Sequence, residues 1–227
     1  MKYDKIIAVV VVVCLAATAV QAQTVAIKNA SVELPDATDG SFPFFGPGSD
    51  WDGEGANGVG VWFPLFYAAT PAPDLNQVTF SQFDGVTMAQ ALEFADTSSV
   101  TASSGEIWAV SFWADNRFGL AAPVQDMLIN LVAEDDSNVF DSVVGGPQGI
   151  GLSQVEGYNF YTTAVTVAGG LGQRDGKQMT LQIIVDSPDN TGQVNLDLVS
   201  MERIPEPSSM VLALVSLGGL GLLRRKR

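Results

Sequence analysis

Short strand-like runs separated by loops are the feature that most constrains the fold of this chain. No stretch between residues 23 and 204 keeps a helical period over three turns, and the one helical candidate, 88–95, is better read as a strand. The runs are rich in β-branched and aromatic residues, and they are 25–34, 60–65, 86–94, 106–114, 127–134, 158–167, 178–185 and 193–201. Loops dense in Gly, Pro, Asp and Asn separate them, among them 35–60, 145–151, 169–176 and 186–192. Because no helices alternate with these runs, they predict an all-β fold, an antiparallel β-sandwich.

Alternation within the runs predicts which side chains are buried. In 106–114, Trp108, Val110 and Phe112 share one face of a strand. One face of 178–185 carries Met179, Leu181, Ile183 and Val185. These two apolar faces are expected to line the core.

The first 22 residues have the pattern of a cleavable signal peptide. Lys2 and Lys5 precede the apolar run 6–17, and small residues lead to Ala22 before Gln23. At about 1.5 Å per residue, this run is too short for a hydrocarbon core of roughly 30 Å. We therefore expect export through the Sec machinery and removal of 1–22 by signal peptidase. A buried N-terminal helix or an uncleaved anchor is the alternative.

The remaining domain, 23–204, has the size of a single domain and is strongly acidic. It holds 23 Asp and Glu residues against five Lys and Arg residues, a net charge of −18. This charge repels nucleic acid and anionic lipid, and it offers carboxylates to divalent cations. The chain has no histidine, and its only cysteine is Cys14. Ser-His-Asp and Cys-His catalysis and His-bound metals are thereby excluded from the domain.

The C-terminal residues 205–227 combine three features in order. The sequence Pro205-Glu206-Pro207 comes first, an apolar run follows over 208–223, and a basic cluster ends the chain. The cluster consists of Arg224, Arg225, Lys226 and Arg227. An apolar run followed by cations predicts a transmembrane helix that stops export with the domain outside. A plain membrane anchor shares this pattern.

These three features resemble the PEP-CTERM sorting signal. The resemblance implies a Gram-negative bacterium that makes exopolysaccharide, and an exosortase that cleaves near Pro205-Glu206-Pro207. It also implies a transient stay in the inner membrane, followed by release to the cell surface or the extracellular matrix.

The domain resembles the galactose-binding-like jelly rolls that often precede such tails. The matching pieces are 29–35, 110–113 and 194–199, although Leu198 stands where the related ending carries Asp or Asn. The resemblance implies a structural calcium held by Glu33 and Asp197. Two solvated strand-end acids are the alternative.

A second acidic segment resembles the opening of an EF-hand calcium loop, with Asp50, Asp52 and Glu54 at its first, third and fifth positions. Val61 occupies the twelfth position, where a bidentate Glu belongs, so a flexible acidic loop is the stronger interpretation.

Trp51, Trp113 and Arg117 are the groups best suited to bind a sugar, because aromatic faces stack on pyranose rings and Arg binds hydroxyls. We therefore expect a non-catalytic module that binds carbohydrate such as exopolysaccharide. A structural matrix protein bridged by calcium and a glycan-processing enzyme are the alternatives.

Overall fold

The structure, a computed structural model, describes residues 23–28, 30, 50–54, 59–62, 73, 78–82, 87–116, 126–133, 143–153, 157–186 and 193–205. In these residues it contains β-strands and one turn of 3-10 helix, Gly172–Arg174. The strands are β1 (Asp52–Glu54), β2 (Val59–Trp62), β3 (Val78–Gln82), β4 (Thr87–Ala91), β5 (Ile107–Asn116), β6 (Asp126–Ala133), β7 (Val143–Gly151), β8 (Asn159–Thr166), β9 (Met179–Asp186) and β10 (Gln193–Ile204). A helix with the length and apolarity to cross a membrane is not found in this described part. The expected signal, 1–22, and the tail from Glu206 onward lie outside it.

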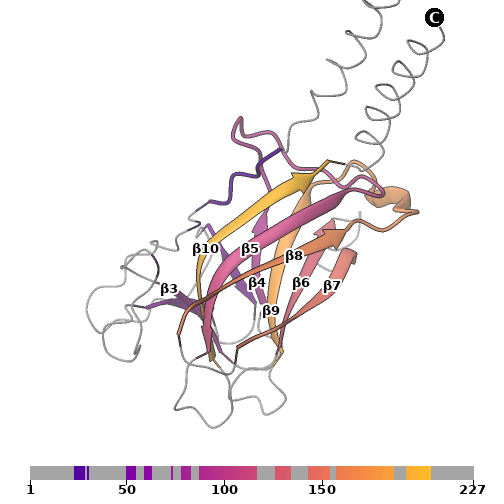
Figure 1. Cartoon of the computed structure of the whole chain (residues 1–227). Coiled ribbons are helices and arrows are strands. Elements are labelled where there is room, and N and C mark those ends of the chain that lie inside the picture. The colour runs from indigo at the N-terminus through magenta and orange to yellow at the C-terminus, as the bar shows by residue number, and fades with distance from the viewer. Residues whose placement is uncertain are drawn as a thin grey trace, which may run out of the picture.

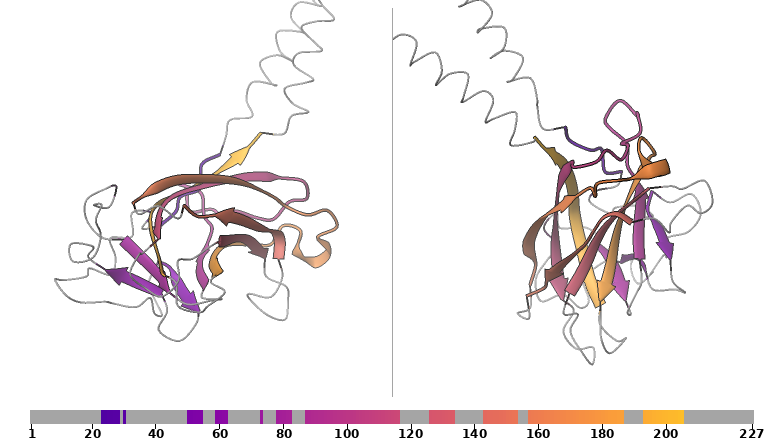
Figure 2. Two further views of the ribbon diagram at one scale, coloured as in Figure 1. Left: turned by 60° about the horizontal axis from the view of Figure 1, so that its bottom comes forward. Right: turned by 90° about the vertical axis from the view of Figure 1, so that its right-hand side faces the viewer.

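The strands form two five-stranded sheets that pack against each other as two layers (Figures 1 and 2). The front sheet, nearest the viewer in Figure 1, has the order β2-β3-β10-β5-β8, and the back sheet has the order β1-β4-β9-β6-β7. Every strand pairing is antiparallel. The predicted all-β antiparallel sandwich is confirmed.

The core lies between the sheets and follows the predicted alternation. Trp108, Val110 and Phe112 on β5 are at most 1% exposed, as are Leu181 and Ile183 on β9. The residues between them on β5 are only partly buried, because successive side chains of a strand point to opposite faces. Fully burying one such side chain contributes roughly 1.5–3 kcal/mol, so each of these residues adds to the driving force for folding.

Two sequence interpretations of local structure had different outcomes. The segment 88–95 was read as a strand rather than a helix, and β4 (Thr87–Ala91) confirms this. The segment 145–151 was expected to be a glycine-rich loop, and this was wrong, since it belongs to β7. Its glycines allow close packing: a Cβ on Gly145 would lie 3.0 Å from the Thr166 carbonyl oxygen, and one on Gly146 would lie 2.5 Å from the Ile129 carbonyl oxygen.

The N-terminal segment 23–28 connects the two sheets at the end of the sandwich where β10 finishes, here called the exit end. On the front sheet, Val25 N–H donates to the Met201 carbonyl (3.0 Å) and Arg203 N–H donates to the Gln23 carbonyl (2.9 Å). On the back-sheet side, Ala26 N–H donates to the Glu93 carbonyl at 2.9 Å. The expected strand over 25–34 is therefore reduced, in its described part, to an isolated bridge at Val25, and Thr24 just before it forms another.

Gln90 on β4 fastens two segments that are distant in sequence. Its side chain is 3% exposed, its Oε1 accepts from Lys28 N–H (2.9 Å), and its Nε2 donates to the Lys28 carbonyl (2.9 Å). The same Nε2 donates to the Asp50 carbonyl at 2.8 Å. One buried amide thus satisfies three backbone groups.

We expect Gln90→Ala to lower the free energy of unfolding by about 2–3 kcal/mol, because it leaves these partly buried backbone groups without their partner. Chemical denaturation of the exported domain measures the change. Gln148→Ala is the control, since the Gln148 amide bonds only the exposed Gly149 carbonyl, at 3.3 Å. Equal effects of the two substitutions would contradict this role of Gln90.

Candidate functional site

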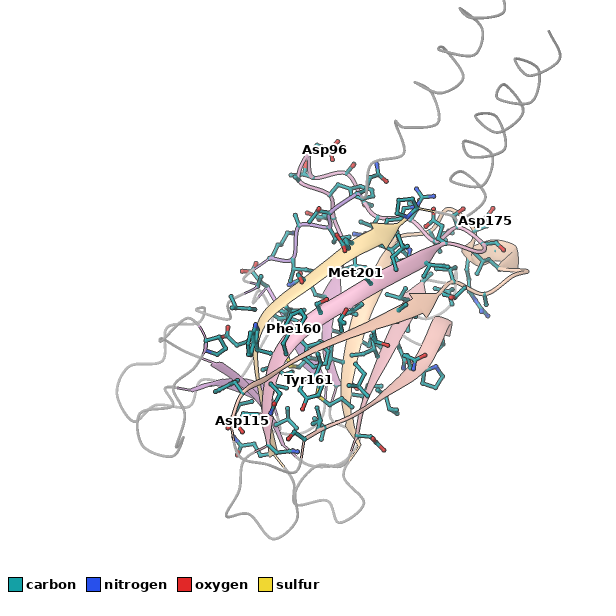
Figure 3. The ribbon with its side chains drawn as sticks, in the orientation of Figure 1. Asp96, Asp115, Phe160, Tyr161, Asp175 and Met201 are labelled. Atoms are coloured by element: carbon teal, nitrogen blue, oxygen red, sulfur yellow. The ribbon has the colours of Figure 1, made fainter. Side chains whose placement is uncertain are left out.

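The candidate site lies on the outer face of the front sheet, at the end opposite to the exit end. β5 and β8 pair residue by residue, with Trp113 opposite Phe160. Both side chains point away from the core, because Phe112 and Tyr161, their neighbours in the strands, stack on the inner side with ring centroids 5.8 Å apart. Phe160 is 56% exposed and Trp113 is partly exposed. Figure 3 shows Phe160 beside the lower part of the front sheet.

Trp113 and Phe160 form a preorganised aromatic pair. Their ring centroids are 5.6 Å apart and the ring planes are inclined by 57°. A cross-strand aromatic pair of this kind contributes roughly 0.2–1 kcal/mol to sheet stability, and it holds both rings in place. Because Phe160 remains more than half exposed, the pair presents apolar surface to a ligand without further rearrangement.

Hydroxyl groups continue the same face toward the exit end. Ser111 Oγ donates to Thr162 Oγ1 at 2.9 Å, and Ser200 Oγ donates to the Ser111 carbonyl at 3.4 Å. Thr162 and Ser200 are exposed. A hydroxyl can both donate and accept, so these groups can bind the hydroxyls of a ligand lying over the aromatic pair.

Polar residues on β10 and β5 adjoin the aromatic pair in the strand register. In the strand register Asp197 lies opposite Trp113, and Asn195 lies opposite Asp115. All three polar residues are at most 4% exposed. Asp115 Oδ1 accepts from Gly157 N–H at 2.9 Å. By this register the three side chains lie on the same face as Trp113, and because they are buried there they do not face solvent.

A β-bulge in β10 adjoins this polar row. The pairing with β5 shifts between Asp197 and Ser200, and Leu198 has a φ of 50°. Asp197 Oδ1 accepts from Leu198 N–H at 2.7 Å, and Val199 N–H donates to the Ala30 carbonyl at 3.0 Å. A left-handed backbone costs an L-residue about 1–2 kcal/mol, so the bulge holds Leu198 under strain.

The structure divides the residues predicted to bind a sugar. Trp113 lies on the outer face of the sheet and is partly exposed, and its binding role stays a prediction. Trp51 is completely buried and belongs to the core, which corrects the expectation that its ring can stack on a sugar. Arg117 lies outside the described residues.

The acidic residues predicted to bind calcium are not brought together in the described part of the chain. Asp52 and Glu54 lie in β1, which pairs with β4, so this part of the segment is an extended strand and the expected flexible acidic loop was wrong here. Asp50 precedes it and is exposed. Asp197 is buried, and Glu33 lies outside the described residues.

Calcium needs six to eight oxygen ligands. The described residues contain no group of three or more acidic, His or Cys side chains able to hold a metal. Calcium at Asp197 therefore stays a prediction.

Phe160 is the site residue that sequence reasoning missed. Its run, 158–167, was identified as a strand, and alternation along it places Phe160 on the same face as Thr162, Ala164 and Thr166. An aromatic residue on an otherwise small and polar face was the signal that could have found it.

The comparisons with known proteins identify the tail. The PEP-CTERM protein-sorting motif matches residues 203–227. The predicted sorting signal is confirmed, and the match begins inside β10, at Arg203. This motif implies an exported protein that an exosortase processes. No curated protein matches the chain significantly.

Solved structures similar to this chain share its fold. A cyclase from Fischerella sp. TAU has a TM-score of 0.56 and 18% identity, covering 82% of this chain and 98% of the cyclase. The Stig cyclase FisC from the same organism, in complex with an indole compound, has a TM-score of 0.53 and 19% identity, covering 82% and 99%. The CBM22 tandem domain of Xyn10C from Paenibacillus barcinonensis has a TM-score of 0.49 and 14% identity, covering 83% and 48%. At these identities the two cyclases establish the fold alone.

The backbone strain at Leu198 in the β10 bulge can be tested by substitution. We expect Leu198→Asn to raise the free energy of unfolding by about 0.5–1 kcal/mol, because Asn tolerates the left-handed region far better than Leu. Denaturant unfolding measures the change. Leu198→Ala is the control, because it removes the exposed apolar side chain and keeps the backbone penalty. If Ala stabilises as much as Asn, the strain argument is wrong.

Proposed function

We propose that this exported, exosortase-processed protein is a non-catalytic module that binds polysaccharide through the Trp113–Phe160 pair. The apolar segment 208–223 holds it transiently in the inner membrane of a Gram-negative cell, and sorting then delivers it to the cell surface or matrix. The observation that carries the proposal is an aromatic pair, fixed by its own packing, with Phe160 56% exposed on the outer face of the front sheet.

The chemistry of this face suits a sugar chain. The apolar faces of pyranose rings pack on aromatic rings, while their hydroxyls bond to neighbouring hydroxyl groups. Trp113 and Phe160 provide the first kind of contact, and Ser111, Thr162 and Ser200 provide the second.

The charge of the domain favours a particular class of polysaccharide. Residues 23–204 carry a net charge of −18, which repels anionic polymers. The aromatic pair and the three hydroxyl residues beside it are uncharged. We therefore propose a neutral or cationic exopolysaccharide as the ligand.

The absence of catalysis is part of the proposal. The chain has no histidine, and its only cysteine, Cys14, lies in the expected signal peptide. The two carboxylates that adjoin the aromatic pair, Asp115 and Asp197, are at most 4% exposed and do not face a bound chain. The likeness to cyclases extends to the fold and carries no activity to this chain.

We expect Trp113→Ala and Phe160→Ala each to weaken binding to the producer's exopolysaccharide by about tenfold, equivalent to about 1.4 kcal/mol. Titration calorimetry of the exported domain measures the affinity. Neither substitution should unfold the domain, because neither ring lies in the core.

Two controls separate binding from stability. Trp108→Ala, on the inner face of β5, should lose about 3–5 kcal/mol of stability. Thr166→Ala, exposed at the far end of β8, should leave both affinity and stability unchanged.

If the wild-type domain binds nothing across a broad glycan array, the proposed binding function is wrong and a structural matrix protein is the better description. Release of new reducing ends from the polysaccharide would instead establish a glycan-processing enzyme.

Sorting has a separate test. Intact-mass analysis of protein from exosortase-positive cells should show a chain that lacks Arg224 to Arg227, while an exosortase-deficient strain should retain them. A full C-terminus in both strains would leave the tail as a plain membrane anchor.

A further inference from the structure

β8 is the outermost strand of the front sheet, and one of its sides is open. On its inner side it pairs with β5 over eight consecutive residue pairs, with no register shift. On its outer side, β7 adjoins the C-terminal end of β8: Gly145 bridges Val167, Ala168 N–H donates to the Val144 carbonyl at 2.6 Å, and a Cβ on Gly145 would lie 3.0 Å from the Thr166 carbonyl oxygen. Between residues 159 and 164, no strand of the described part pairs with this outer side.

The direction of the backbone groups in β8 follows from the residue after it. Val167 N–H donates to the Glu106 carbonyl (2.8 Å) and its carbonyl accepts from Gly105 N–H (3.0 Å), so Val167 faces the β5 side. In an antiparallel ladder this direction alternates along the strand. Alternate residues of β8 therefore direct their N–H and C=O groups to the open side. These residues are Phe160, Thr162 and Ala164, and all three are exposed.

β8 lacks the devices that normally keep such an edge from pairing. Its sequence, Asn159–Thr166, contains no charged residue and no proline, and its ladder has no bulge. Proteins usually protect an open edge with Lys, Pro or a bulge, because unpaired backbone groups are a template for another strand. An unprotected edge of this length is available to pair with another strand.

We propose that β8 pairs antiparallel with β8 of a second copy of this chain, about a twofold axis, so that two front sheets become one continuous sheet. An antiparallel strand edge is complementary to itself, which a twofold interface requires. The charge of the domain also favours β8 as the contact. Two copies with a net charge of −18 repel each other, and β8 is a strand without acidic residues, so pairing there brings no carboxylates of the two strands together.

The dimer has a consequence for ligand binding, and this part rests on the proposed function. In a continuous sheet both outer faces are the same face, so the two Trp113–Phe160 pairs lie on one side of the assembly. A single polysaccharide chain can then engage both copies, and linked sites bind polymers far more tightly than one site does.

The test is sedimentation equilibrium of the exported protein purified from exosortase-positive cells. We expect a monomer–dimer equilibrium that tightens as salt is added, because salt screens the repulsion between acidic copies. Ala164→Pro removes a backbone donor from the open side without removing a bond to β5, and it should be monomeric with an unchanged melting temperature. Ala164→Ser keeps that donor and should dimerise as the wild type does.

Each other outcome contradicts the proposal. A wild type that stays monomeric at all concentrations overturns it, and so does Ala164→Pro that dimerises normally. Assemblies larger than a dimer that grow with concentration would show head-to-tail pairing of β8 with another edge. If Ala164→Pro does not fold, Ala164→Asp places a carboxylate from each copy at the shared edge and should also abolish the dimer.

Failure of the dimer and failure of the binding module give different results. A soluble oligosaccharide should bind each protomer of Ala164→Pro with wild-type affinity, whereas immobilised polysaccharide should retain this variant at least about tenfold less well. If the intact dimer does not bind the oligosaccharide, the proposed binding function is wrong and the proposed dimer is still supported.

Discussion

The central strand β10 has different neighbours along one of its two sides, and the arrangement of the molecule depends on this change. β5 bonds to the other side of β10 from Val194 to Ile204. On the variable side, β3 pairs with residues 193–196, and the N-terminal segment bonds to Met201 and Arg203. The bulge at Leu198 lies between these two neighbours. An extra residue bends and twists a strand, which lets one strand serve two partners that do not lie in line.

This strand also separates the proposed binding face from the sorting motif. The aromatic pair lies level with Asp197, and the sorting motif begins at Arg203. At about 3.3 Å per residue these points are roughly 20 Å apart along the strand. Arg203 is held by Glu106 through an ion pair of 2.7 Å between Nη2 and Oε1. Processing of the tail can therefore proceed without disturbing the face that we propose binds polysaccharide.

Sequence reasoning succeeded where a local period carries the information. Trp108, Val110 and Phe112 were assigned to the core from alternation alone, and all three are at most 1% exposed. It failed where a loop was inferred from amino-acid composition alone. The Gly-rich stretch 145–151 reads as a loop, yet those glycines are what lets β7 pass close to its neighbours.

The sequence by itself determined the class of fold, the buried faces of the long strands and the sorting tail, because each depends on residues close together in the chain. Only the tertiary structure decided which tryptophan meets solvent. Trp51 and Trp113 both adjoin acidic residues, but Trp51 precedes a short strand that packs beside β4, and Gln90 bonds to its neighbour Asp50 from 40 residues away. Burial at such a position depends on which distant segments pack against it, and alternation along a single strand does not predict those long-range contacts.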